Sequence, residues 1–166
     1  MSIGSIIGRV ASALVVGLLV TVAWNPTASA NDTVIVRKVV QNSRVASNYT
    51  NWGQVIASCK VVRDGTSCTI THSTSSTRTV SLDLGITRKD VSAKLGFSSS
   101  SSVGVSVSCT SGPMKKNSIF SAWPRGDRYR YKVERKTYLN RGTQVLTNTS
   151  GWLYAFNPYA NGFTCG

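Results

Sequence analysis

Residues 69–109 read TITHSTSSTRTVSLDLGITRKDVSAKLGFSSSSSVGVSVSC, and polar and apolar side chains alternate along most of this run. Serine, threonine or aspartate fills every odd position from Thr69 to Asp83. Successive side chains of a strand point to opposite faces, so a period of two indicates half-buried antiparallel strands. The apolar positions of the pattern are Val80, Leu82, Leu84, Ile86, Val91, Ala93, Leu95, Phe97, Val103, Val105, Val107 and Cys109.

With turns at residues 87–90 and 98–102, this pattern predicts a three-stranded meander. The predicted facing pairs are Leu84 with Ala93, Leu82 with Leu95, Val80 with Phe97, Leu95 with Val105 and Ala93 with Val107. A slip of one residue would turn every apolar side chain to water, so the pattern specifies its own register. The hydroxyl-rich face of the meander either faces water or belongs to a hairpin that inserts into a membrane.

Residues 1–30 have the anatomy of a secretory signal peptide. Arg9 precedes an apolar run at residues 10–24, and the small residues at 28–30 suit cleavage before Asn31. A membrane-spanning anchor is the alternative, but the apolar run is short for a bilayer of roughly 30 Å. The sequence therefore predicts a secreted mature chain, residues 31–166, that forms one domain.

The mature chain is strongly basic. The full sequence contains 19 basic and 6 acidic residues, and losing Arg9 with the leader leaves 18 against 6, a net charge of +12. Such a charge indicates an anionic partner: an acidic protein, a cell-surface polymer, an anionic membrane or a nucleic acid. Because secretion separates the protein from nucleic acid, no physiological nucleic-acid partner is expected.

The four cysteines predict two disulfides, because an even number in an exported chain indicates a crosslinked framework. Cys59 and Cys68 flank the turn signal at residues 63–65, and a four-residue loop would place them on facing strands. We therefore expect Cys59–Cys68 and, by elimination, Cys109–Cys165. A metal site is not expected, since the spacings do not fit and the sequence contains no CxxC.

Residues 31–51 differ from the rest, with two short β-prone clusters that lack a tight turn between them. One alternative is a first strand of the domain followed by a loop. The other is an extended arm that pairs with another protein's sheet edge, ahead of a disulfide-stapled domain at residues 52–166. In the second case the partner-binding residues are Val34, Ile35, Val36, Arg37, Lys38, Val39 and Val40.

Four further strands are expected after Cys109, at residues 119–123, 128–139, 143–147 and 152–156. Residues 124–127 would stop the first of them, a turn at residues 140–142 would follow the second, and residues 157–166 would form a turn-rich tail. The whole pattern predicts an all-β fold, an antiparallel β-sandwich or an elongated twisted sheet with two disulfides.

The strand at residues 128–139 concentrates positive charge. Its even positions and the preceding turn contribute the candidate partner-binding residues Arg125, Arg128, Arg130, Lys132 and Lys136. Aromatic residues are interleaved at Trp123, Tyr129, Tyr131 and Tyr138. One interpretation is a solvated face that prevents edge aggregation; the other is a contact surface for an acidic protein or cell-wall polymer.

Nothing in the sequence predicts catalysis. His72, the only histidine, has no nearby carboxylate or thiol, and no hydrolase, metalloprotease or phosphate-loop motif occurs. The six acidic residues are scattered, and three of them sit at turns where local hydrogen bonding is their usual role. We therefore expect no catalytic residue, no metal and no cofactor.

Two family resemblances accompany these patterns. Residues 67–109 with SIFSAWPRGDRYRYKVER at residues 118–135 resemble the pore-forming lobe of aerolysin-like toxins, which implies a membrane-active hairpin at Ile86–Phe97. The layout of a small, secreted, basic, four-cysteine β protein with an extended start is similar to the adaptor subunit of actinobacterial umbrella toxin particles. That resemblance implies a non-catalytic subunit that joins a lectin subunit to a repeat-bearing toxin stalk.

The expected function is therefore binding rather than catalysis. The lead hypothesis is an adaptor or interaction subunit of an extracellular antibacterial toxin complex, with other secreted protein subunits as partners. The alternative is a small aerolysin-like protein that acts on membranes.

Overall fold

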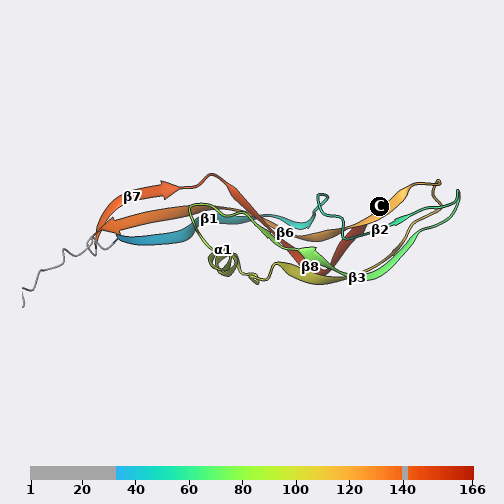
Figure 1. Cartoon of the computed structure of the whole chain (residues 1–166), viewed down its shortest axis with the longest axis horizontal. Helices are drawn as coiled ribbons and strands as arrows, with labels where there is room; N and C mark the ends of the chain where they lie inside the picture. The colour runs from blue at the N-terminus through green and yellow to red at the C-terminus, as the bar shows by residue number, and fades with distance from the viewer. Residues whose placement is uncertain (1–32, 140–141) are drawn as a thin grey trace, which may run out of the picture. The chain divides into compact units, whose positions relative to one another are not determined.

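The computed structural model describes residues 33–139 and 142–166 and shows an all-β fold of antiparallel strands, as the sequence predicts (Figure 1). The predicted leader at residues 1–30 and most of the predicted turn at residues 140–142 lie outside the described residues. The described elements are β1 (Thr33–Thr50), β2 (Ala57–Lys60), β3 (Thr69–Thr77), β4 (Thr79–Val80), α1 (Arg88–Leu95), β5 (Ser102–Thr110), β6 (Ile119–Leu139), β7 (Thr143–Thr149) and β8 (Leu153–Cys165).

β6 is the central strand, because four other strands form antiparallel ladders with it. β1 and β7 flank its second half, and β2 and β8 lie along its first half (Figure 1). β4 joins the outer edge of β8, which completes a six-stranded sheet. Four of the other eight described elements are therefore positioned directly by one strand of 21 residues.

The predicted stop at residues 124–127 and the predicted turn-rich tail at residues 157–166 are both wrong. β6 continues through Pro124 and Gly126, and β8 runs alongside it as far as Cys165. A register shift at Pro124 absorbs the missing N–H of the proline. Gly126 permits the continuation, because a Cβ atom there would lie only 2.6 Å from the Cα atom of Pro158.

The second sheet consists of β3 and β5, which pair in register from Thr69 opposite Thr110 to Thr77 opposite Ser102. Both are predicted strands, but their partners are not the predicted ones, because Val105 and Val107 face β3 residues. The inward side chains of this sheet pack against those of the first sheet. Their shared core contains Ile56, Val61, Cys68, Ile70, Val105, Val107, Phe120 and Ala122.

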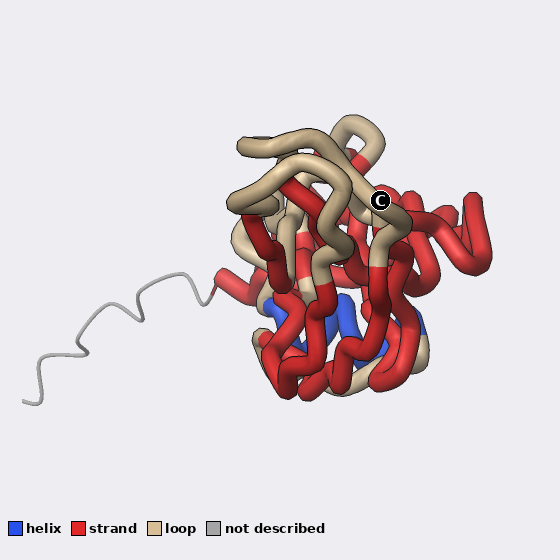
Figure 2. Tube along the Cα trace, turned by 90° about the vertical axis from the view of Figure 1, so that its right-hand side faces the viewer, coloured by secondary structure: helices blue, strands red, loops and turns tan. Residues whose placement is uncertain are grey.

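The middle strand of the predicted meander is wrong, because residues 88–95 form the helix α1. Leu84, Leu82 and Val80 therefore have none of their predicted partners. α1 lies against one face of the first sheet (Figures 1 and 2), where Val91 is fully buried and Leu95 is 8% exposed. Residues four apart share one side of a helix, so these two positions fit a helix as well as a strand.

Local capping signals explain why the helix is preferred. The hydroxyl of Thr87 accepts a hydrogen bond from the backbone N–H of Asp90 at 3.2 Å and donates to its carboxylate at 2.6 Å. Gly96 ends the helix in the left-handed conformation, with φ of 80°, and returns its N–H to the last turn. A threonine cap with an acidic residue three positions later and a glycine after the last turn define both ends.

Arg78 fixes the segment that leads from β3 to the helix. Its side chain is buried, and its guanidinium donates to the Asn157 side chain and to the Ser100 carbonyl, both at 2.8 Å. Burial lowers the pKa of Arg78, and the neighbouring Arg88 adds to this effect. One cation thus joins the two ends of the connection between β3 and β5.

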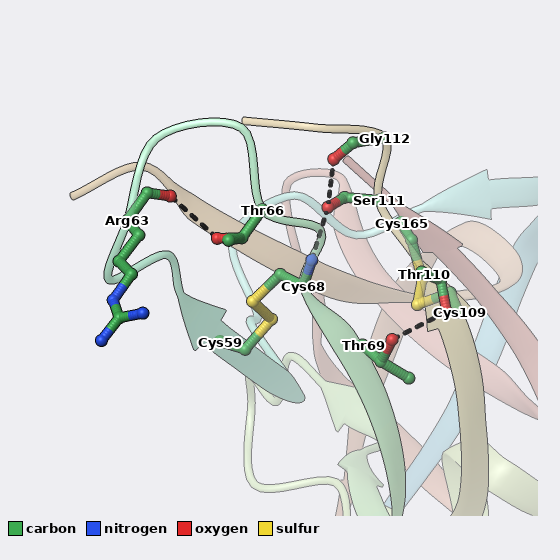
Figure 3. The surroundings of a disulfide bond; sticks show 10 residues. All are labelled: Cys59, Arg63, Thr66, Cys68, Thr69, Cys109, Thr110, Ser111, Gly112 and Cys165. Carbon is green, nitrogen blue, oxygen red and sulfur yellow. Dashed lines mark hydrogen bonds between the residues drawn. A yellow bond between two sulfur atoms is a disulfide. The ribbon is translucent and has the colours of Figure 1, made fainter. Parts of the chain in front are cut away.

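Both predicted disulfides are confirmed, Cys59–Cys68 and Cys109–Cys165 (Figure 3). The hairpin behind the first prediction is wrong, because β2 pairs with β6 while β3 pairs with β5. Both disulfides therefore link the two sheets. Cys68 is also held by its own N–H, which donates to the Ser111 hydroxyl at 2.9 Å (Figure 3).

The structure places residues 33–50 in β1, which pairs with β6 from Thr33 opposite Leu139 to Thr50 opposite Arg125. Of the two alternatives for this segment, a first strand describes the fold. Val39 packs in the second core cluster, with Ile86, Val91, Leu95, Tyr131, Val133 and Ala155. The role of Val34–Val40 in binding a partner stays a prediction.

Candidate binding face

The alternation along β6 separates a charged surface from the core. Tyr131 and Val133 are fully buried against α1, and β1 lies beside them in the sheet. Arg128, Arg130 and Lys132 occupy the alternate positions and therefore lie on the opposite face of the sheet. The sequence-predicted separation of odd and even positions is confirmed for this part of β6.

Aromatic side chains of β1, of β8 and of the residue just before β8 lie against these three cations. The guanidinium of Arg128 lies 5.1 Å from the ring centre of Tyr49 and 4.8 Å from that of Tyr154. Arg130 and Lys132 both lie over Trp152, at 4.6 and 4.8 Å. Such contacts attract the cation to the ring and hold it in one place. We call the six residues the cation–aromatic face: Tyr49, Arg128, Arg130, Lys132, Trp152 and Tyr154.

The charges of this face are not neutralised internally. No carboxylate of the described residues lies within 4.0 Å of Arg128, Arg130 or Lys132. Arg130 donates a hydrogen bond to the Ser43 hydroxyl, at 3.3 Å. Uncompensated cations on rigid aromatic supports are suited to an acidic ligand, because little side-chain freedom is left to lose on binding.

Lys136 shares the same side of β6 but is paired with an acid. Its ammonium group lies 3.5 Å from Oε1 of Glu134, and that of Lys38 lies 3.3 Å from the same oxygen. Oε1 is buried and makes no hydrogen bond of good geometry, so the two ammonium groups compensate its charge mainly through space. Of the predicted basic residues, Lys136 is therefore the one tied into a local ion network.

Arg125 does not join the others, because it occupies an odd position of β6 whereas they occupy even positions. It borders a separate shallow pocket of about 320 Å³ with Asn48, Tyr159 and Gly162. Four of the five predicted basic residues thus share one side of β6, and three of them form the cation–aromatic face.

The space beside Arg128 is small. A pocket of about 180 Å³ is lined by Tyr49, Arg128, Tyr154 and Phe156 with their neighbours. Sites that enclose small molecules usually have about 300–1,000 Å³. The geometry favours contact with a surface or chain rather than enclosure of a small ligand.

Of the predicted arm residues, Val34–Val40, only Val39 is buried, and most of the others are exposed along β1. Val34 and Val36 are 49% and 43% exposed, whereas Val39 is buried. Arg37 donates from Nε to the Leu84 carbonyl at 2.9 Å, which ties β1 to the segment before α1. Val39 and Arg37 therefore help to hold the fold together, and most of the stretch remains accessible.

Asp127 organises a separate polar cluster near the middle of β6. Its carboxylate accepts hydrogen bonds from the Tyr159 hydroxyl at 2.6 Å and from the Tyr129 hydroxyl at 3.4 Å. Arg44 of β1 lies 3.6 Å away. The bond to Asp127 raises the pKa of Tyr159, and burial raises that of Tyr129, so both hydroxyls remain donors at neutral pH. The cluster links β1, β6 and β8.

Replacing Tyr131 by phenylalanine is expected to reduce the loss of stability at high pH. The buried hydroxyl of Tyr131 donates to the Ser81 carbonyl, and burial raises its pKa from 10.0 to about 12. As the pH rises, the unfolded chain releases this proton before the folded protein does. The stability that the Tyr131 hydroxyl contributes is therefore complete below pH 10 and falls as the pH rises toward 12. Thermal melts across this range should give a shallower decline for Tyr131→Phe. A decline as steep as that of the control, Tyr154→Phe, would contradict the assignment.

His72 lies exposed on β3, opposite Val107. No three metal-ligating side chains of residues 33–139 and 142–166 lie together. None of these residues forms a helix with the length and apolar character that a membrane crossing needs.

Comparison with family models, with curated proteins and with solved structures gives no match for this chain.

The aromatic half of the face does not come from the aromatic residues that are interleaved with the cations in the sequence. Tyr129 and Tyr131 lie on the core side of β6, and Trp123 packs edge-on against Trp52 at 4.9 Å. The rings that support the cations come instead from β1, from β8 and from the residue just before β8. Alternation along β6 already places the tyrosines at odd positions and the cations at even positions on opposite faces of the sheet. Nothing in the local sequence, however, identifies the rings from other parts of the chain that contact these cations.

Proposed function

We propose that this protein is a secreted, non-enzymatic binding protein that serves as an adaptor or interaction subunit of an extracellular antibacterial toxin complex. The cation–aromatic face is the observation that supports the proposal. Three cations without carboxylate partners are held on aromatic rings on one side of a crosslinked sheet. Such a surface is suited to contact with a partner.

The composition of the face resembles the centre of protein interfaces. Tryptophan, tyrosine and arginine contribute most of the residues whose loss weakens binding strongly. The high positive charge steers an acidic partner toward this surface and speeds association. An acidic protein subunit is therefore the proposed ligand, ahead of an anionic cell-surface polymer or membrane.

Secretion is part of the proposal. Two disulfides persist in oxidising compartments and are rare in reducing ones. The predicted leader at residues 1–30 gives the route of export.

The proposal is tested by neutralising the face. Affinity purification of the secreted protein from culture supernatant, followed by mass spectrometry, should recover an acidic protein subunit in stoichiometric amount. The triple variant Arg128→Gln, Arg130→Gln, Lys132→Gln is expected to weaken that complex about 100-fold, because three hot-spot cations are lost together.

A variant of equal charge change provides the control. Lys60→Gln, Lys115→Gln, Lys116→Gln removes three exposed cations that lie outside the cation–aromatic face, and it should keep the complex. Recovery of monomer alone from the wild type, or equal weakening by both triple variants, would overturn the proposal.

A second candidate function, action on membranes, is favoured by one feature of the segment between β3 and β5. Residues 79–97 carry a strand-like alternation, although the structure holds them as β4, turns and α1. Because β3 and β5 are already paired, an extended form of this segment would lengthen their hairpin. Release of dye from anionic liposomes by the purified protein alone would support this function over the adaptor function.

A further inference from the structure

β7 is an edge strand without the usual protection. It pairs with β6 on one side, and no other strand of the described residues pairs with its outer side. Its sequence, TQVLTNT, contains no charged residue and no proline. Val145 and Leu146 are 49% and 48% exposed. Soluble proteins normally blunt such an edge, because its free N–H and C=O groups can pair with another chain.

The contrast with β1, the edge strand on the other side of the sheet, shows what protection looks like in this protein. β1 carries Arg37, Lys38 and Arg44. Gln41 and Asn48 have positive φ values of 47° and 53°, next to shifts in the pairing with β6. Charges and bulges both discourage addition of a further strand, and β7 has no charge of its own.

The hydrogen-bond pattern shows which groups of β7 are available. The N–H of Ser150 donates to the carbonyl of Val133 at 2.9 Å. Antiparallel ladders alternate, so the next residue of β7 bonded to β6 is Asn148. Thr147 and Thr149 therefore direct their backbone N–H and C=O groups to the outer edge.

We propose that the outer edge of β7 accepts an extended segment of a partner protein in which acidic residues alternate with apolar ones. Partner side chains opposite Thr147 and Thr149 would lie on the same face of the sheet as Lys136. A partner side chain opposite Leu146 would lie on the other face and contact the leucine side chain. The neighbouring rungs of β1 and β6 supply four cations and one acid: Lys38, Lys136 and Glu134 lie on that face, and Arg37 and Arg135 lie on the opposite face.

The same charges argue against a second copy as the occupant. Pairing of two β7 edges would bring two sets of these cations together, at a cost in repulsion. An acidic segment instead satisfies both the free backbone groups and the excess positive charge, which is the mode of strand addition. This site goes beyond the proposed function, because it lies outside the cation–aromatic face and gives the protein a second place to hold a partner.

The test uses a synthetic octapeptide that alternates glutamate with valine. On adding it, the amides of Thr147 and Thr149 are expected to exchange with solvent at least about tenfold more slowly, as newly formed ladder hydrogen bonds require. Thr147→Pro removes the outward N–H without breaking the ladder to β6 and should weaken binding about tenfold or more. Thr147→Ala keeps that N–H and is the matched control.

Two further measurements keep the proposal falsifiable if proline disturbs the strand. Thr147→Lys leaves the backbone intact and should also prevent addition, and a lysine–valine octapeptide should not bind. Absence of protection at both amides, or equal binding of the lysine peptide, would overturn the proposal. Protection that rises with protein concentration without peptide would assign the edge to a second copy. Neither result depends on the triple variant of the cation–aromatic face, which should still bind the glutamate peptide.

Discussion

Replacing Cys109 and Cys165 together by alanine is expected to lower the free energy of unfolding by about 4 kcal/mol, in the chain-entropy description of disulfides. The two cysteines are 56 residues apart, and their bond joins the end of β5 to the end of β8. Without it, the unfolded chain gains the freedom of a long loop. The loss should be visible as a lower midpoint in urea denaturation.

The other disulfide provides the internal comparison. Cys59 and Cys68 are nine residues apart, so replacing this pair by alanine is expected to cost about 3 kcal/mol. Both variants should keep the native strand content by circular dichroism. A larger loss for the short loop than for the long one would contradict the expectation and indicate that packing, rather than chain freedom, decides the effect.

Gly126→Ala is expected to destabilise the protein by about 3 kcal/mol, the upper end for overpacking. The added methyl group would meet the carbonyl oxygen of Asn157 and the Cα atom of Pro158, both on the backbone of β8. A backbone cannot rotate away as a side chain can, so β6 and β8 would have to separate at this point.

Gly104→Ala in β5 is the control for this substitution. A Cβ atom there meets nothing within 4 Å, so its effect should be close to zero or slightly favourable. Urea denaturation of both variants measures the difference. Similar stabilities for the two would show that β8 does not approach β6 as closely as described.

Sequence reasoning predicts the strands and crosslinks of this fold better than their pairing. The alternation at Val103, Val105 and Val107 identifies β5, and cysteine spacing with elimination identifies both disulfides. The helix is missed because Val91 and Leu95 satisfy a period of two and also a spacing of four. Only the cap at Thr87 and the glycine at position 96 distinguish the two, and both were available in the sequence.

For the candidate site, too, the sequence predicts features within one strand but not the contacts between strands. The cations at Arg128, Arg130 and Lys132 lie on one strand, so their common face follows from alternation alone. Tyr49 and Trp152 reach that face from distant parts of the chain, through the pairing of β1 with β6 and the approach of the residues before β8. Strand order is decided by packing across the whole domain, which no local pattern of residues contains.

The position of β6 also sets the order of events during folding. β1 is made near the start of the domain, but its partner residues, Arg125 to Leu139, are made near the end. The first strand must therefore wait, unpaired, until most of the domain has been synthesised. Contacts between such distant residues slow folding, because a long loop has to close before they form. We expect the chain to fold late and all at once, after synthesis rather than during it.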